Sequence, residues 1–319
     1  MSARHQIDSI AFQTIDMGSR VVLGGLAPAS HDIDQTVQPA ESGSPYAHSH
    51  FVVDATERFQ FTCKSLATLL ENLQLLGPNC VDAATAGDGI DLFAQQLSEC
   101  ATGGRAAGSS HNRVRAAKAR LFLRSLAFQG DASGTAQLEG VLLATDADGE
   151  TAPSTTIYNA ALETAIVDEE LRRGPVQIHG VDLVSNMIQS VNFELGPTFR
   201  VVFGDGGEAV AIVYQKNVTK VTVVTQETDL YDAARLPRRQ RVAAANTTFG
   251  LRRRDPATGG LVPKATTSHV QLSASGLMTI SQPVSGSAGE EATTTIVIDG
   301  DHSTGTTPPI GVSTGVALT

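Results

Sequence analysis

A weak internal repeat constrains this chain more than any other feature of its sequence. Near the front, residues 7–12 (IDSIAF) resemble residues 188–193 (IQSVNF), and each segment is followed by a Gly and then by Arg-Val-Val. Near the back, Ala161-Leu162 resembles Ala317-Leu318, which lies 156 residues later. Several short matches in one order predict two tandem copies of a single structural unit.

The distance between matching segments varies along the chain. Ser268-His269 follows Ser110-His111 by 158 residues, whereas the front segments lie 181 residues apart. A second copy that is shorter in its front part, with one helix in place of two, would explain the difference. Chance similarity among strands rich in Gly and Thr is the alternative explanation.

Most of the chain has the pattern of short strands between turns. Residues 138–144 form an apolar run that ends at an Asp-Ala-Asp-Gly turn, and residues 199–203 and 209–214 flank the Gly-rich hairpin turn 204–207. Two helices are predicted in the first half. Residues 65–76 place Leu at spacings of three and four, and residues 90–100 place Ile, Phe, Ala and Leu on one stripe.

Composition excludes several classes of protein. Aromatic residues make up 5% of the 319 residues and Trp is absent, which disfavours an aromatic-lined ligand pocket. Three cysteines (Cys63, Cys80 and Cys100) without a C-x-x-C spacing disfavour disulfides and structural zinc. Asp8 and Asp16 interrupt the first segment and no apolar run approaches roughly 18 residues, so we expect neither a secretory signal nor a membrane helix.

The net charge of −10 is unevenly placed. Residues 1–172 contain 11 Lys and Arg against 21 Asp and Glu, a balance of −10, and residues 173–319 contain 12 of each, a balance of zero. An acidic surface repels nucleic acid, so a conduit lined with this charge would let DNA slide through. Ordinary surface charge for solubility is the alternative interpretation.

No nucleophile, zinc-protease or nucleotide-binding motif occurs, and we expect no catalytic residue, no cofactor site and no metal site. His48 and His50 are the nearest approach to a metal pair, with Asp54 or His31 as further ligands, but a surface loop explains them more simply. The turns at residues 146–150 and 299–303 space carboxylates like half of a calcium loop, and they lack its glycine and its distal Glu.

Two basic runs, residues 238–241 (RRQR) and 252–255 (RRRD), lie in the neutral second half with a single Phe between them. Nucleic-acid binding requires more aromatics or a clearly basic domain. Two interpretations stay open for these runs: pairing with carboxylates of a neighbouring subunit, or solvated loops.

The second half has a recurring order of segments. A strand with Ser-Val at residues 190–191 leads to the hairpin turn 204–207, then to residues 221–229 (VTVVTQETD), and the chain closes with residues 309–318 (PIGVSTGVAL). This order resembles the tail tube proteins of long-tailed bacteriophages. The resemblance covers residues 188–319 and, through the repeat, residues 7–162.

The resemblance implies a mainly β fold with few helices, built as two tandem tail-tube-like β-sandwich or barrel domains, residues 1–172 and 173–319, each with a flanking helix. In that family, six such domains form a ring with a continuous inner barrel, and rings stack into the tube through which DNA is ejected. A doubled chain then predicts three chains per ring with pseudo-sixfold symmetry. A ring of six chains is the alternative.

We therefore expect a non-enzymatic virion protein of the phage tail, synthesised in the host cytoplasm. Its expected partners are copies of itself, other tail proteins, and double-stranded DNA that passes through the lumen without specific binding; no membrane is involved. The alternatives are a tail terminator, baseplate or capsid decoration protein, and a β-sandwich adhesin or carbohydrate-binding module. A hydrolase on a β scaffold lacks a nucleophile arrangement in this sequence.

Overall fold

Almost all of the described chain is β-strand or the turns between strands, as the short runs rich in Val, Ile, Thr and Phe predict. The computed structural model describes residues 4–40, 49–97, 104–130, 132–166, 169–230, 235–286, 291–301 and 308–318. The elements of the first half are β1 (Arg4–Phe12), β2 (Val21–Leu23), β3 (Leu26–Ala40), β4 (Ser49–Cys63), α1 (Leu66–Asn72), β5 (Asn79–Asp82), α2 (Ala83–Ala86), β6 (Ile90–Leu97), β7 (Ser110–Ala116), β8 (Lys118–Gln129), β9 (Thr135–Leu143) and β10 (Ser154–Ala161).

The second half continues with strands and short 3₁₀ turns. They are β11 (Leu171–Ile178), β12 (Val181–Leu183), η1 (Ser185–Met187), β13 (Ile188–Glu194), β14 (Pro197–Phe203), β15 (Ala209–Asn217), β16 (Lys220–Thr225), η2 (Thr228–Leu230), β17 (Arg239–Val242), η3 (Ala244–Asn246), β18 (Thr248–Arg253), β19 (His269–Ala274), β20 (Gly276–Ser285), β21 (Thr293–Gly300) and β22 (Ile310–Val316).

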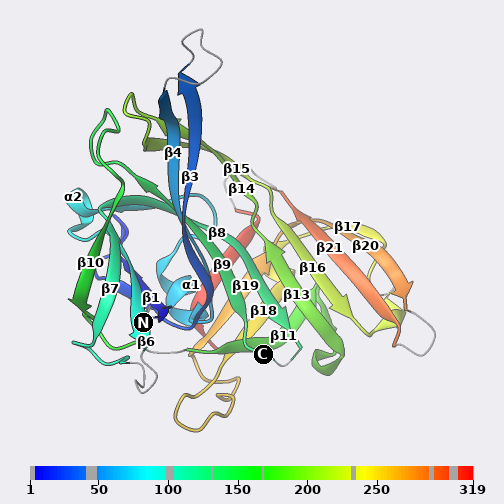
Figure 1. Ribbon diagram of the computed structural model, residues 1–319. Helices are drawn as coiled ribbons and strands as arrows, with labels where there is room; N and C mark the ends of the chain where they lie inside the picture. The colour runs from blue at the N-terminus through cyan, green and yellow to red at the C-terminus, as the bar shows by residue number, and fades with distance from the viewer. Residues whose placement is uncertain are drawn as a thin grey trace.

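Three antiparallel sheets and one extra hairpin account for these strands. The first outer sheet has the order β10-β7-β6-β1-β2, and the second outer sheet has the order β12-β11-β18-β19-β22. The long sheet runs β17-β20-β21-β16-β13-β8-β9-β4-β3, with β5 beside β8, and β14 pairs only with β15. In Figure 1 the hairpin of β3 and β4 projects above the body, and β17, β20 and β21 lie at the opposite side of the molecule from β7 and β10.

The strand order repeats. The places of β10, β7, β6, β1 and β2 in the first outer sheet are those of β22, β19, β18, β11 and β12 in the second. In the long sheet, β3-β4-β9-β8 is followed by β13-β16-β21-β20 in the same order, and β5 flanks β8 as β17 flanks β20. The chain therefore contains two copies of one topology, the first repeat (β1–β10) and the second repeat (β11–β22).

The register of the strands repeats as closely as their order. The β3–β4 hairpin has a register shift between Thr36 and Val37, and the hairpin built from β13–β14 and β15–β16 has one between Thr198 and Phe199, 162 residues later in each case. Shifts also follow Leu26 and Ile188, again 162 residues apart. Because register shifts are fixed features of a strand pair, β3 corresponds to β13 plus β14, and β4 to β15 plus β16.

The end of each repeat matches in the same detail. Asn159 in β10 and Gly315 in β22, 156 residues apart, both have left-handed backbone conformations with φ of 55° and 64°. Each lies at the register shift of its strand. Leu162 and Leu318 follow these strands and are buried. The sequence match at the back of the chain thus falls on equivalent strands.

The match at the front of the chain is wrong. Residues 7–12 lie in β1 of the first outer sheet, whereas residues 188–193 lie in β13 of the long sheet. By register, Ile10 of β1 corresponds to Val176 of β11, since these two residues pair with Leu23 of β2 and Leu183 of β12. The two repeats are therefore of similar length. The strand order divides them between Leu162 and Leu171, so the expected boundary at residue 172 falls inside β11.

The expected helix at residues 90–100 is also wrong, because residues 90–97 form β6. Leu92 and Phe93 point to opposite faces of this central strand and both are buried. A strand that is covered on both faces carries apolar residues at every spacing, including the helical one. Residues 98–100 lie outside the described chain.

Among the described residues, a flanking helix occurs in the first repeat alone. Of the expected residues 65–76, α1 covers Leu66–Asn72, and the backbone is extended at Leu73. In the second repeat the same place, between β16 and β17, holds the 3₁₀ turn η2, and the described residues 169–230 and 235–286 contain no α-helix.

One apolar core joins the two repeats. It lies between the long sheet and both outer sheets, and its buried members come from strands of each repeat. Phe193 makes edge contacts with Phe128 and Phe249, with ring centroids 6.5 Å and 5.0 Å apart. Phe128 belongs to β8 of the first repeat, so the core continues across the junction of β8 with β13.

Candidate functional site

The two repeats are joined by strand pairing between β8 of the first repeat and β13 of the second. Residues 125–129 of β8 pair antiparallel with residues 190–194 of β13, and β5 pairs with residues 118–121 of the same edge of β8. The edge of β8 is thus divided between a strand of its own repeat and a strand of the next repeat. Backbone pairing makes the long sheet continuous across this boundary.

Apolar contacts seal the junction where the hairpin of the second repeat leaves β8. The amide of Leu195 donates to the carbonyl of Arg124 at 2.9 Å, and the Leu195 side chain is fully buried. Beyond it, Phe199 stacks on Phe122 with centroids 4.4 Å apart. The hairpin of β14 and β15 therefore crosses the first repeat and packs on Val141 and Leu143 of β9.

The tip of that hairpin interlocks with a turn of the first repeat. The Gly206 amide donates to the Asp148 carbonyl at 2.8 Å, and the Ala55 amide of β4 donates to the Gly207 carbonyl at 2.8 Å. A Cβ on Gly204 or Gly206 would overlap the backbone at residues 148–149. Only glycine permits this approach of two backbones.

Two carboxylates face each other beside the interlocked tip. Glu57 of β4 is buried, and its carboxylate binds the His31 ring and the Ser154 hydroxyl. Burial raises the pKa of the Glu208 carboxyl, and the Glu57 carboxylate raises it further. Like charges in a partly desolvated contact favour protonation of one of them.

The two ends of the long sheet are open. At one end, β3 has no strand on its outer side among the described residues. At the other end, β17 pairs with residues 276–279 of β20, and no strand among the described residues pairs with the rest of β20 on that side. Ile33 on β3 and Val284 on β20 are exposed, at 57% and 62%.

A shallow polar groove crosses the face of the long sheet that does not pack on the core. Hydroxyl and amide side chains make up half of its lining residues, among them Ser125, Gln129 and Asn192, and its charged residues are Arg124, Lys220 and Glu194. The negative charge of the first half does not gather in this groove. The acidic lumen expected from the charge balance finds no support on this face.

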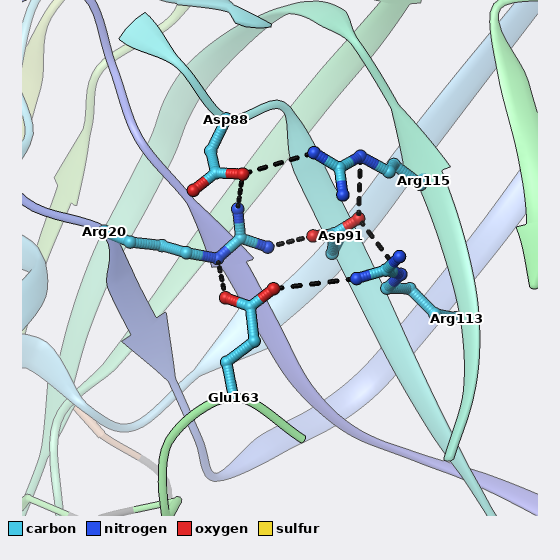
Figure 2. Close-up of polar contacts among 6 residues, drawn as sticks. All are labelled: Arg20, Asp88, Asp91, Arg113, Arg115 and Glu163. Carbon is cyan, nitrogen blue, oxygen red and sulfur yellow. Dashed lines mark hydrogen bonds and ion pairs between the residues drawn. The ribbon is translucent and has the colours of Figure 1, made fainter. Parts of the chain in front are cut away.

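A network of six charged residues lies on the outer face of the first outer sheet, as Figure 2 shows. Arg20 binds the buried Asp91 carboxylate and also Glu163, with Nε and Oε2 2.8 Å apart. Arg113 and Arg115 approach Asp91 from β7. The sixth member is Asp88, which binds Arg115 at 3.2 Å and Arg20 at 3.4 Å.

Three arginines and three carboxylates balance in charge in this network. Arg20 hydrogen-bonds Oδ2 of the buried Asp91, while Arg113 and Arg115 lie 3.8 and 3.9 Å from its Oδ1, which accepts no hydrogen bond from the described residues. The network joins β6 and β7 to the segments before β2 and after β10, so it fastens the start and the end of the first repeat. The second repeat has Thr248, Gln271 and Ser273 at the places of Asp91, Arg113 and Arg115. The outer faces of the two repeats have therefore diverged.

The metal candidates do not come together. His50 lies in β4 opposite Pro39, whereas His31 lies opposite Phe59, and His48 lies outside the described residues. The Asp146 carboxylate accepts the amides of Glu150 and Thr151, four and five residues further along its own turn, and the Glu150 amide lowers the pKa of Asp146 most. Within the described part of the chain, no three His, Cys, Asp or Glu side chains are grouped to hold a metal ion.

The second carboxylate turn and the basic runs form ion pairs within the chain. Asp301 binds Arg241 at 2.6 Å, and Arg254 binds Glu170 at 2.9 Å. Arg253 binds Glu169, whose other carboxylate oxygen accepts the Thr68 amide of α1 at 3.0 Å. The run at 252–254 therefore ties the linker between the repeats to both of them.

Cys63 is buried and its thiol donates to the Gly24 carbonyl at 3.5 Å, Cys80 is partly buried, and Cys100 lies outside the described residues. Sequence reasoning missed the ionic network. The spacing of Arg113 and Arg115 was a signal for it, because residues two apart share a face of a strand. The network was missed because residue 91 was predicted to lie in a helix.

Comparison with models of known protein families gives no match, and comparison with curated proteins gives none. Neither α1 nor α2, the helices of the described residues, has the length and apolar character of a membrane-crossing helix.

Proposed function

We propose that this chain is a non-enzymatic structural protein that assembles head to tail through its sheet edges, and that it forms the rings of a phage tail tube. In each contact the free part of β20 pairs with β3 of the next chain, as β8 pairs with β13 within the chain. Each chain contributes to the inner barrel the eight strands β3-β4-β9-β8-β13-β16-β21-β20 of its long sheet, without the flanking strands β5 and β17. Three chains then close a ring of six repeats.

The observation that carries this proposal is a difference in burial between two equivalent residues. Leu195 is fully buried where β13 joins β8, and Ile33, which occupies the same position in β3 by the 162-residue spacing, is 57% exposed. Ile33 is apolar at the position where the junction of β8 with β13 covers Leu195. Its exposure supports the same kind of junction between two chains.

The polar groove supports the tail tube in particular. If the face without a core lines the lumen, DNA meets a groove in which half of the lining residues carry hydroxyl or amide groups and three carry a charge. Such a surface holds phosphates only weakly and lets DNA slide, since tight nucleic-acid binding needs clustered Lys and Arg. The two domains expected at residues 1–172 and 173–319, with their boundary moved to the segment between Leu162 and Leu171, then serve as two tail-tube domains of one subunit.

Purified full-length chain tests this function. Electron microscopy and sedimentation at rising concentration should show rings or hollow tubes. The variant Ile33→Asp should block assembly, because a charge cannot enter the apolar junction. Its control, Ile15→Asp, changes a residue that is 43% exposed on the turn after β1, and it should assemble normally. A strictly monomeric wild-type protein at high concentration would refute the proposal.

A further inference from the structure

The two free edges of the long sheet carry opposite charges. On the β3–β4 hairpin, Asp34 and Asp54 lie on one face, since Asp34 pairs with Thr56 and Asp54 with Thr36. At the other end of the sheet, Arg238 and Arg239 are exposed at the start of β17. Within the described residues, none of these four side chains forms an ion pair.

The repeat indicates where these charges meet. Inside the chain, the Gly77 amide before β5 donates to the Asn217 side chain at 2.9 Å. By the register of β5 on β8 and of β17 on β20, Gly77 corresponds to Arg238. Asn217 corresponds to Ala55, next to Asp54. The same contact between two chains places Arg238 beside Asp54.

The register of the free strands agrees with this placement. Inside the chain, residues 192 and 194 of β13 pair with residues 127 and 125 of β8. In the other repeat, Ser30 and Asp32 of β3 correspond to residues 192 and 194, and Ser285 and Gln282 of β20 correspond to residues 127 and 125. In the contact between chains, Ser30 should therefore pair with Ser285, and Asp32 with Gln282. Asp34, two residues further along β3 than Asp32, should then lie beside the start of β17 of the next chain. There the Arg238 carbonyl accepts the Ile280 amide at 3.1 Å.

We propose that the acidic edge of β3 and β4 recognises the Arg238-Arg239 corner of a second copy of this chain, and that these charges set the head-to-tail order of assembly. This inference rests on the proposed self-assembly. Inside the chain the equivalent positions are Gly196, Lys216, Gly77 and Pro78, which include no pair of opposite charges. A junction within one chain needs no selection of partner, whereas a junction between chains does.

The charges also exclude a wrong partner. Two β3 strands could pair with each other as exposed edges, and the aspartates of both would then lie side by side. Like charges in that contact oppose it, so β3 is left for the basic end of the sheet. Attraction at the correct edge and repulsion at the wrong one act together.

Charge reversal in the full chain tests this inference. The double variant Asp34→Arg with Asp54→Arg, and the double variant Arg238→Glu with Arg239→Glu, should each raise the concentration needed for assembly about tenfold or more. The quadruple variant, which exchanges the two signs, should restore assembly. Asp16→Arg and Lys264→Glu are exposed controls and should leave it unchanged.

Melting curves verify that each variant remains folded, and the rescue by the quadruple variant does not depend on that control. Assembly by both double variants at the wild-type concentration would overturn the charge pairing while the proposed function stands. Failure of the quadruple variant to recover would overturn it as well. Failure of the wild type to assemble would instead overturn the proposed function.

Discussion

At the scale of single residues, burial decides which charges matter. Asp91 is fully buried among three arginines, whereas Asp88 in the same network is about one-third exposed. Asp91→Asn should destabilise the protein by about 3–5 kcal/mol, since it leaves buried guanidinium groups without their counter-ion. Asp88→Asn should cost less than about 1 kcal/mol. Urea unfolding of the two variants measures both values, and equal values would contradict the assigned role of Asp91.

A second residue-scale prediction concerns pH. The pKa of Glu208 lies above the ordinary Glu value of 4.5, so the favourable effect of its protonation is complete below that pH and is lost as the pH rises through the folded-state pKa. Glu208→Gln should therefore raise the melting temperature at pH 7, and the gain should shrink toward zero near pH 4.5. Glu71→Gln, an exposed change of equal charge, is the control. A pH-independent gain would show that charge is not the cause.

At the scale of elements, the β14–β15 hairpin joins the second repeat to the first. The β14–β15 tip is held by backbone contacts at Gly204 and Gly206 that leave no room for a Cβ. Gly206→Ala should release the tip and speed hydrogen exchange at the Ala55 amide, which donates to Gly207. Gly18→Ala, where a Cβ meets nothing within 4 Å, is the control. Unchanged exchange at Ala55 would mean that the tip tolerates the larger residue.

The sequence predicted elements better than their places. The strands predicted at residues 138–144, 199–203 and 209–214 and the hairpin turn at 204–207 follow from alternation and turn residues, and they are confirmed, whereas β3 and β17 of the long sheet were not predicted. The strand β6 was missed because a strand with both faces buried has no alternation. The back of the repeat was found because Ala161-Leu162 recurs as Ala317-Leu318 at a spacing of 156 residues. The front of the repeat was misaligned because residues 7–12 and 188–193 share a pattern of Ser, an apolar residue and Phe that strands of different sheets can have.

At the scale of the whole molecule, one contact is formed within the chain and its counterpart is left open. The duplicated topology joins β8 to β13 and leaves their counterparts β20 and β3 at the ends of the sheet in the described part of the chain. Burying Ile33 at such an edge is worth about 1.5–3 kcal/mol per contact, and the backbone pairs add to it. A ring of three contacts is therefore cooperative, so assembly should be steep in concentration. Analytical ultracentrifugation should show monomers and closed rings with few intermediates.

Electron cryo-microscopy of the assembled particles tests the central claim most directly. The account predicts three chains around a central lumen, related by pseudo-sixfold symmetry, with β20 of each chain paired to β3 of the next and with Asp32 opposite Gln282. A ring of six complete chains, or an assembly in which β3 and β20 both remain unpaired, would contradict it.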